Sequence, residues 1–245
     1  MAEYFKLHPQ HPQARSIQRI AAALREGAVM LYPTDTVYAI GCDVTHKQAV
    51  ERVRRLKRLS NDKPLTFLCP SLSQIAQYAQ VSDPAYRLMR RLIPGPFTFL
   101  LPATKLVPKL VMDPKRKTTG IRVPDSAICQ ALLAELGNPI VSTSAKLGGD
   151  PVGSLEVGFD SAGDWEEGGI FTAEDMRQLE KQVDLVLDDE APYRAQVSTV
   201  IDLTGPEPLL VRAGLGYEQV ADLINKSKSE AGGSGGLRAE GSRVL

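Results

Sequence analysis

The sequence predicts an α/β fold with a mixed sheet flanked by helices, and three observations support this prediction. Short apolar runs of strand length alternate with stretches whose apolar residues recur at helical spacing. Near the C-terminus, predicted strands follow one another directly, so the sheet should contain antiparallel as well as parallel pairs. The chain has 245 residues, a length at which α/β proteins often form a single domain. We expect one domain over 1–226 and a disordered Gly/Ser-rich tail over 227–245.

The predicted strands are short apolar runs bounded by prolines, glycines or polar clusters. Glu3–His8 alternates only weakly and is closed by His8-Pro9, so we expect it at an edge of the sheet. The other expected strands span 28–32, 37–41, 64–69, 97–102, 119–123, 139–143, 183–187, 198–203 and 209–212.

The predicted helices show apolar residues three and four positions apart. The first is expected over 13–26, with Gly27 just beyond its C-terminus. Thr45 is the expected N-cap of a second helix that extends to Leu59. On the outer face of that helix we expect Arg52, Arg54, Arg55, Lys57 and Arg58. Further helices are expected over 71–78, 83–92, 125–137 (capped by Asp125 or Ser126), 173–181 and 216–226, with a long mobile loop over 148–169.

The composition argues against several classes of protein. Lys+Arg and Asp+Glu both number 29, so no net charge attracts nucleic acid or an anionic membrane to the molecule as a whole. Cys42, Cys69 and Cys129 lie far apart in apolar surroundings, which indicates buried thiols rather than disulfides. The histidines lack metal-ligand spacing, so we expect no metal site. No apolar run approaches the ~20 residues of a membrane span, and we expect a cytoplasmic protein.

Polar residues gather where short apolar strands end. Pro33 interrupts the strand at 28–32, and three hydrogen-bonding side chains follow at Thr34, Asp35 and Thr36, so we interpret this segment as delivered to a site. Any one such cluster is more simply explained by turns or caps, but several together indicate a polar site. The other hydroxyl groups at strand ends belong to Thr118, Thr119, Ser142, Thr143, Ser144, Ser198 and Thr199.

Two arginines lie in apolar strands, Arg122 in GIRV and Arg212 at the end of LLVR. A buried arginine needs an anion or a carbonyl as partner, because an unpaired buried charge is costly. That partner is either a structural ion pair or the carboxylate or phosphate of a ligand, and the sequence leaves both open. The two arginines, the hydroxyl groups and the basic end of the second helix together predict a pocket for a small anionic ligand. The simplest such ligand is a nucleotide with an amino acid.

Seven segments together resemble the YrdC/YciO family, and they occur in the family's order. They are PTDTVYAIG, LKRLSNDKPLTFL, PGPFTFLL, GIRVPD, STSA, STVIDL and VRAG. The resemblance implies an open, twisted α/β sheet with a large concave, basic surface. It also implies a relation to threonylcarbamoyl-AMP synthases, which make the activated intermediate for N6-threonylcarbamoyladenosine in tRNA. Other members of the family were described as binding double-stranded RNA.

The implied reaction converts L-threonine, bicarbonate and ATP into threonylcarbamoyl-adenylate and pyrophosphate. The protein's task in it is to position two anions and neutralise developing charge, with Mg²⁺ accompanying ATP as substrate and no tightly bound cofactor. By resemblance, L-threonine would be held by Thr34, Thr36, Arg122, Ser142 and Ser198. The nucleotide would be held by Lys57, Arg58, Lys63, Thr118, Ser144, Lys146 and Arg212, with Lys57, Arg122 and Arg212 as catalytic residues.

Three positions depart from the pattern of the synthase members. Leu59 stands where they carry the arginine of a Lys-x-Arg pair, Lys146 where they carry the asparagine of Ser-x-Asn, and Leu68 where they carry a histidine. The loss of an arginine donor at a phosphate site removes charge stabilisation and can cost orders of magnitude in rate. The resemblance is therefore nearest to the YciO-like branch, and it implies binding of ATP and L-threonine with weak or residual synthase activity.

The sequence leaves two other functions open. Basic residues over 52–63, 87–91 and 105–117 could converge on one face and bind tRNA or double-stranded RNA without catalysis. Such binding would weaken steeply with salt. A related carbamoyl- or acyl-adenylate chemistry on a different amine is the third possibility. A continuous basic groove would favour RNA, whereas a pocket rimmed by hydroxyl groups would favour the nucleotide.

Overall fold

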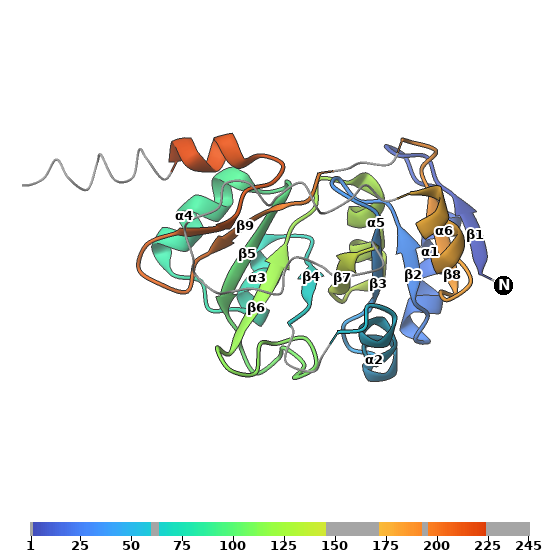
Figure 1. Ribbon diagram of the computed structural model, residues 1–245, viewed down its shortest axis with the longest axis horizontal. Helices are drawn as coiled ribbons and strands as arrows, with labels where there is room; N and C mark the ends of the chain where they lie inside the picture. Colours follow the sequence, from blue (N-terminus) through green and yellow to red (C-terminus); the bar gives the residue numbers. More distant parts are fainter. Residues whose placement is uncertain (1, 60–63, 146–171, 193–195, 224–245) are drawn as a thin grey trace, which may run out of the picture.

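The computed structural model describes residues 2–59, 64–145, 172–192 and 196–223, in which one ten-stranded sheet runs through the molecule (Figure 1). The expected loop at 148–169 and the tail at 227–245 lie outside the described residues. The domain limit at 226 therefore stays a prediction. Among the helices of the described ranges, none is long and apolar enough to cross a membrane.

The expected mixed sheet is confirmed. Its order is β1-β8-β2-β3-β7-β4-β6-β5-β9-β10, so the predicted edge strand near the N-terminus does lie at an edge. Four neighbouring pairs are parallel, namely β1–β8, β2–β8, β4–β6 and β5–β9, and the others are antiparallel. The strands are β1 (Glu3–Lys6), β2 (Met30–Tyr32), β3 (Ala39–Asp43), β4 (Thr66–Leu68), β5 (Phe97–Pro102), β6 (Thr118–Arg122), β7 (Ile140–Ser144), β8 (Leu185–Asp188), β9 (Thr199–Asp202) and β10 (Leu209–Arg212).

The helices lie close to their predicted positions. They are α1 (Ala14–Arg25), α2 (Lys47–Leu56), α3 (Leu72–Tyr78), α4 (Asp83–Leu92), α5 (Ala127–Leu136) and α6 (Ala173–Leu179), and the described part of the C-terminal region adds a helical segment at 217–223. Ser126, one of the two candidates, caps α5 by accepting the N–H of Cys129 at 3.3 Å. Gly27 adopts a left-handed φ of 94°, as expected for a residue just beyond a helix.

Two expectations about α2 are wrong. Its N-cap is His46, whose side chain accepts the N–H of Ala49, while Thr45 donates its N–H and its hydroxyl to Asp43 in a local turn. Arg54 does not lie on the outer face: it is buried, and its Nη1 donates to the carbonyl of Leu110 at 3.0 Å. The physical reason is helical spacing, because a residue four positions after buried Val50 lies on the same inner face.

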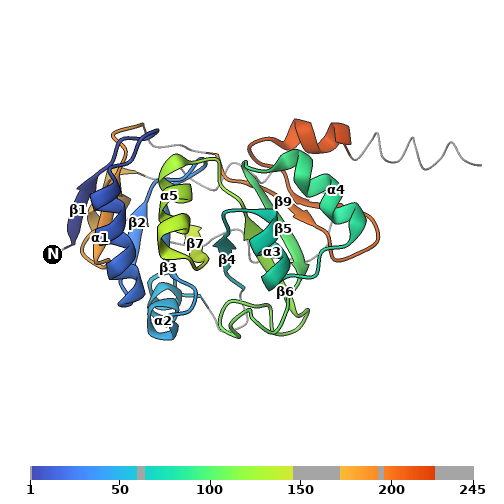
Figure 2. The same ribbon diagram turned by 180° about the vertical axis from the view of Figure 1, so that it is seen from behind.

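Alternate residues of the strands face two hydrophobic cores. Helices α2, α3, α4 and α6 pack on one face, against side chains such as Leu31, Phe67 and Ile121. Helices α1 and α5 pack on the other face, against Met30 and Ile140. Adjacent strands in a sheet are rotated by about 20° on average, so a ten-stranded sheet turns through a large angle. This twist explains why α1, α5, α3 and α4 are all seen from the same side in Figure 2.

The second face has a polar part. Helices α1 and α5 cover it from β1 to β7, with Leu68 of β4 at their margin. Strand alternation and register place polar side chains on its remainder. Those side chains belong to Thr66, Thr98, Thr118, Arg122, Ser142 and Ser144. The fold thus separates two apolar cores from one polar stretch of sheet.

Candidate functional site

Residues 33–38 join β2 to β3 in a turn that is held by its own hydroxyl groups. Thr34 Oγ1 accepts the N–H of Thr36 at 3.1 Å and donates to the carbonyl of Val37 at 2.7 Å. Short hydroxyl side chains readily make such local backbone contacts. Thr34 therefore shapes the turn, and it places the hydroxyl of Thr36 next to Arg122.

Arg122 lies at the end of β6 and is buried, with its side chain only 7% exposed. Its Nη1 donates to Thr36 Oγ1 at 2.7 Å, and its Nε donates to the carbonyl of Gly95 at 3.3 Å. Its Nη2 lies 2.7 Å from Oδ1 of Asp35, whose side chain is 10% exposed. Of the two partners that the sequence leaves open for Arg122, a structural ion pair is thus present.

A second arginine reaches the same part of the sheet from β10. Thr98 on β5 pairs across the sheet with Arg122, and its hydroxyl lies 2.9 Å from the hydroxyl of Ser198. Arg212 donates from Nη2 to the Ser198 hydroxyl at 3.1 Å, and from Nε and Nη2 to the Ser198 carbonyl at 3.1 and 2.9 Å. The two strand-borne arginines are thus linked by the backbone pairing of Arg122 with Thr98 and by the side-chain contacts of Thr98, Ser198 and Arg212. We call this group of residues the arginine cluster; it comprises Asp35, Thr36, Thr98, Arg122, Ser198 and Arg212.

The serines of β7 form a second group. Ser142 and Ser144 are two positions apart in β7, so their side chains lie on the same face of the strand. The hydroxyl of Tyr32 donates to Ser142 Oγ at 2.8 Å, and Lys57 Nζ donates to Ser144 Oγ at 3.4 Å. Burial raises the pKa of Tyr32 well above its usual value, so this phenol stays protonated and remains a donor at neutral pH. Lys57, just after α2, thus approaches the sheet face from another element.

The other predicted nucleotide-binding residues are Thr118, Arg58, Lys63 and Lys146, and the structure describes only the first two. Thr118 is buried at the start of β6, opposite Pro102 of β5. Arg58 is exposed and adopts a left-handed φ of 50° directly after Lys57. Lys63 and Lys146 lie outside the described residues. Of the predicted threonine-binding residues, the structure joins Thr34, Thr36 and Arg122 by direct contacts and places Ser142 and Ser198 with other partners.

Sequence reasoning missed three members of these networks. The sequence predicts that Asp35 is delivered to the site with its polar segment, but gives it no ligand-binding role and does not identify it as the ion-pair partner of Arg122. Tyr32 and Thr98 were treated only as parts of strands. A signal for Tyr32 exists, since it directly precedes Pro33 and its hydroxyl is the one polar group of an otherwise apolar run.

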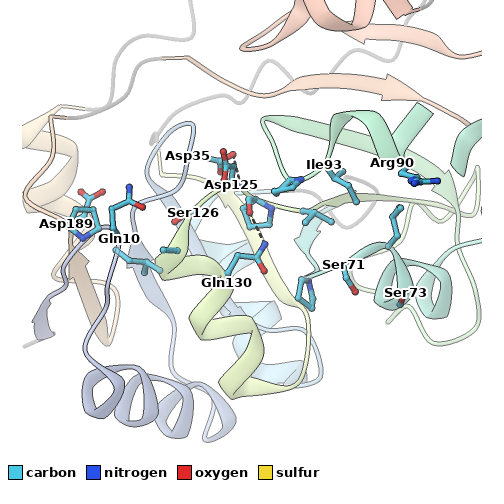
Figure 3. A pocket seen from close by; sticks show the side chains of 18 residues that line it. Gln10, Asp35, Ser71, Ser73, Arg90, Ile93, Asp125, Ser126, Gln130 and Asp189 are labelled. Atoms are coloured by element: carbon cyan, nitrogen blue, oxygen red, sulfur yellow. Dashed lines mark hydrogen bonds between the residues drawn. The ribbon is translucent and has the colours of Figure 1, made fainter. Parts of the chain in front are cut away.

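A separate cavity of about 820 Å³ opens beside the first turn of α5 (Figure 3). Its wall includes Gln10 from the segment after β1, Ser71 before α3 and Arg90 of α4. Asp35 also lines it, and Oδ2 of Asp35 accepts the N–H of Asp125 at 3.0 Å. Asp35 therefore belongs both to the wall of this cavity and to the arginine cluster.

Several basic residues considered for RNA binding have partners within the chain. Arg52 pairs with Asp184 at 2.5 Å, and Arg116 pairs with Asp202 at 2.5 Å. Arg54 is buried against the Leu110 carbonyl. Arginines that are engaged in this way are less available to phosphate groups. In the described ranges, no group of three or more His, Cys, Asp or Glu side chains is placed to hold a metal ion.

A family model, Sua5_yciO_yrdC, described as "Telomere recombination", matches residues 22–156. YciO of Escherichia coli K12 is 40% identical over 221 residues, which cover 88% of this chain and 97% of that protein. The chain belongs to the Sua5/YciO/YrdC family. The crystal structure of E. coli YciO superimposes with a TM-score of 0.75 over the same shares of the two chains.

Family members with a named activity are also similar to this chain. The threonylcarbamoyl-AMP synthase of Vibrio vulnificus YJ016 is 34% identical over 137 residues, which cover 55% of this chain and 73% of that enzyme. The crystal structure of P. abyssi Sua5 in complex with L-threonine matches with a TM-score of 0.75 at 26% identity, and the match covers 90% of this chain and 60% of that one. The expected family and fold are therefore confirmed, and the fold is shared with a protein that binds L-threonine.

Proposed function

We propose that this protein binds ATP and L-threonine on the polar part of its sheet and, with bicarbonate, forms threonylcarbamoyl-adenylate and pyrophosphate slowly. The observation that carries the proposal is the arginine cluster, in which a buried, oriented guanidinium lies among hydroxyl groups. An arginine in this setting suits the planar carboxylate of an amino acid. Support also comes from the similarity to Sua5, whose structure was determined with L-threonine.

The threonine half of the proposed site is built around Arg122. Its contacts with Gly95 and Thr36 engage one N–H on Nε and one on Nη1, while Nη2 forms an ion pair with Asp35 at 2.7 Å that lacks hydrogen-bond geometry. A guanidinium carries five N–H groups, so each terminal nitrogen keeps at least one donor for a carboxylate. The hydroxyl groups of Ser142 and Ser198 are placed on the same polar stretch, where they can hold the rest of the amino acid.

The nucleotide half is assigned to Lys57, Ser144 and Arg212. Threonine's amine and bicarbonate give an N-carboxylate with loss of water, and an oxygen of this carbamate attacks the α-phosphorus of ATP. The bond to the bridging oxygen breaks, and pyrophosphate leaves. Negative charge grows on the phosphate oxygens during this step, and Lys57 and Arg212 neutralise it. Mg²⁺ enters with the triphosphate, since Mg²⁺ is commonly held through substrate phosphates.

The low rate follows from two apolar side chains, Leu59 two residues after Lys57 and Leu68 opposite Arg122 on the neighbouring strand β6. Leu68 is buried in the core beside α5, and Leu59 packs against the core beside α2. Neither side chain can donate a hydrogen bond to a phosphate oxygen. Each donor missing from a phosphoryl-transfer site removes stabilisation of the developing charge.

The proposal is tested by incubating the protein with ATP, L-threonine, bicarbonate and Mg²⁺, and measuring pyrophosphate and the adenylate by chromatography and mass spectrometry. We expect slow formation of both products and no adenylate when threonine or bicarbonate is omitted. Lys57→Ala should abolish turnover, whereas Lys47→Ala, at the exposed start of the same helix, should not. No turnover combined with no ATP binding in calorimetry would overturn the proposal. Salt-dependent binding of tRNA in place of ATP would favour the RNA-binding alternative.

A further inference from the structure

We infer that Asp35 is the positioning residue of Arg122: its carboxylate fixes the guanidinium in the orientation that receives the carboxylate of L-threonine. The inference rests on the proposed function of the arginine cluster. The side chain of Asp35 is 10% exposed, and it acts on the ligand only through Arg122.

The two carboxylate oxygens of Asp35 face different partners. Oδ1 lies 2.7 Å from Nη2 of Arg122, and Oδ2 accepts the backbone N–H of Asp125 at 3.0 Å. Both roles require an acceptor. An asparagine has only one oxygen, so Asp35→Asn would turn an N–H₂ group toward one of the two donors. A carboxylate is therefore the side chain that satisfies both contacts at this position.

The ion pair also makes a buried Arg122 tolerable before any ligand binds. The Arg122 side chain is 7% exposed, and burial of a lone guanidinium would be costly. With Asp35 the pair carries no net charge, and contacts to Thr36 and Gly95 fix the plane of the guanidinium. A ligand then meets an arginine whose orientation is already set, which lowers the entropy lost on binding.

The orientation of the Arg122 guanidinium depends, through Asp35, on the start of helix α5. Asp125 directly precedes Ser126, the N-cap of α5, so the anchor of Asp35 belongs to the start of a helix packed against α1. Figure 3 shows Asp35 and Asp125 side by side at the wall of the cavity. The turn at 33–38 is thereby tied to α5 at the point where it supports Arg122. Sites held by helices and strands are positioned more precisely than sites on free loops.

The test compares L-threonine with L-threoninamide, which lacks the carboxylate, by calorimetry on the full chain. We expect the wild-type protein to prefer L-threonine, and Asp35→Asn to reduce this preference by about ten- to a hundredfold, the range for one charged hydrogen bond. Asp35→Glu keeps the charge but displaces the carboxylate, and it should also reduce the preference. In an Arg122→Lys background, Asp35→Asn should reduce it no further.

Controls separate positioning from folding. Asp43→Asn makes the same change at a second aspartate, which is buried and accepts hydrogen bonds from Thr45 and Asn138, and it should leave the preference unchanged. Equal preference for L-threonine in Asp35→Asn, Asp35→Glu and the wild type would overturn the inference.

If the wild type binds no threonine, the proposed function fails. The exchange rate of the Arg122 Nε–H with solvent, measured by NMR in the free protein, then decides the inference: we expect faster exchange in Asp35→Asn, and an unchanged rate would overturn it.

Discussion

Arg122 is a charged residue that is buried at the end of a strand, where polar groups surround its guanidinium. Its nitrogens meet a carboxylate, a hydroxyl and a backbone carbonyl, which come from two different loops. This arrangement offsets the cost of burying the charge and leaves donors for a ligand. A substitution that keeps the positive charge beside Asp35 should therefore affect ligand binding more than folding.

Arg122→Lys should weaken binding of L-threonine by about a hundredfold and leave the fold intact. A lysine keeps the charge beside Asp35, but a single ammonium group cannot copy a bidentate contact with a carboxylate. Calorimetric titration with L-threonine measures the effect, and thermal unfolding checks the fold. Arg87→Lys, at an exposed position on α4, is the matched control and should bind like the wild type. Equal affinity in the two variants would remove Arg122 from the site.

At this scale the sequence predicts residue types better than partners. Arg122 contacts Thr36 and Arg212 contacts Ser198, because polar residues in apolar strands need polar partners. The pairing of Arg122 with Thr98, whose hydroxyl contacts Ser198, brings the two pairs onto neighbouring strands. Asp35 was not foreseen as the partner of Arg122, since the ion pair joins residues that are far apart in the sequence. Only the three-dimensional arrangement of the turn at 33–38 and the end of β6 brings them together.

At the scale of elements, the pairing of β3 with β7 is a close backbone contact. A Cβ atom added to Gly41 would lie 2.5 Å from the carbonyl oxygen of Val141 and 2.8 Å from the ring of Tyr32. Tyr32 in turn donates to Ser142, so this contact supports one half of the proposed site. Glycine is therefore required here to let the strands approach each other.

Gly41→Ala should destabilise the protein by about 1–3 kcal/mol, the usual cost of overpacking a core. The added methyl group meets a backbone atom that cannot turn away, so β3 and β7 must separate. Urea unfolding followed by circular dichroism measures the loss. Gly205→Ala is the control, because its nearest neighbour would be 3.8 Å away, and it should change stability little. A loss of stability in Gly205→Ala as large as that in Gly41→Ala would contradict the steric explanation.

The segment before β6 is tied to β9 by an ion pair that predicts a pH dependence. Burial alone would raise the pKa of Asp202, but hydrogen bonds from Thr204 and Arg116 outweigh it and hold the pKa below its usual value. A carboxyl whose pKa is lower in the folded state stabilises the protein above its unfolded pKa, about 3.9. This contribution is lost as the pH falls from there through the folded pKa.

Asp202→Asn should therefore lower stability at pH 6 by about 1 kcal/mol, the net value of a typical hydrogen bond, and have less effect near pH 2. Urea unfolding at a series of pH values measures the difference. Glu207→Gln alters an exposed carboxylate just before β10 and serves as the control. An effect of Asp202→Asn that is equal at both pH values would contradict the proposed role of ionisation.

The elements themselves were largely predictable, because apolar runs and helical spacing are local signals. The errors at α2 have a common cause in contacts outside the helix. His46 caps it because Asp43 takes up the donors of Thr45 in a turn. Helical spacing places Arg54 on the inner face of α2, and the Leu110 carbonyl supplies the partner that its buried charge needs. A sequence pattern assigns arginine to solvent by default, because that partner is not visible in it.

At the scale of the whole molecule, the order of the strands and the twist of the sheet could not be predicted from the sequence. Neighbours in the sheet such as β8 and β2, or β5 and β9, are brought together from distant parts of the chain. The accumulated twist decides which helices cover which part of each face. The location of the polar stretch between two apolar cores is therefore a property of the complete sheet, although each hydroxyl group in it was visible in the sequence.

The three thiols give a test of whether the two cores unfold together. Cys42 and Cys69 are buried in the core beside α2, and Cys129 is buried in the core beside α5. Burial raises the pKa of the Cys42 and Cys69 thiols, so these groups are neither accessible nor ionised near pH 8. We therefore expect a thiol reagent such as Ellman's reagent to leave the native protein unmodified.

In urea, all three thiols should react at the rate of global unfolding, because the strands of one sheet line both cores. The reaction is followed spectrophotometrically, and variants that each retain a single cysteine assign the rates. Ser73→Cys, at an exposed position in α3, is the control and should react at once in the native state. If Cys129 reacts at urea concentrations where Cys42 and Cys69 remain protected, the core beside α5 opens by itself, and the anchor of Asp35 at the start of α5 is then not rigid.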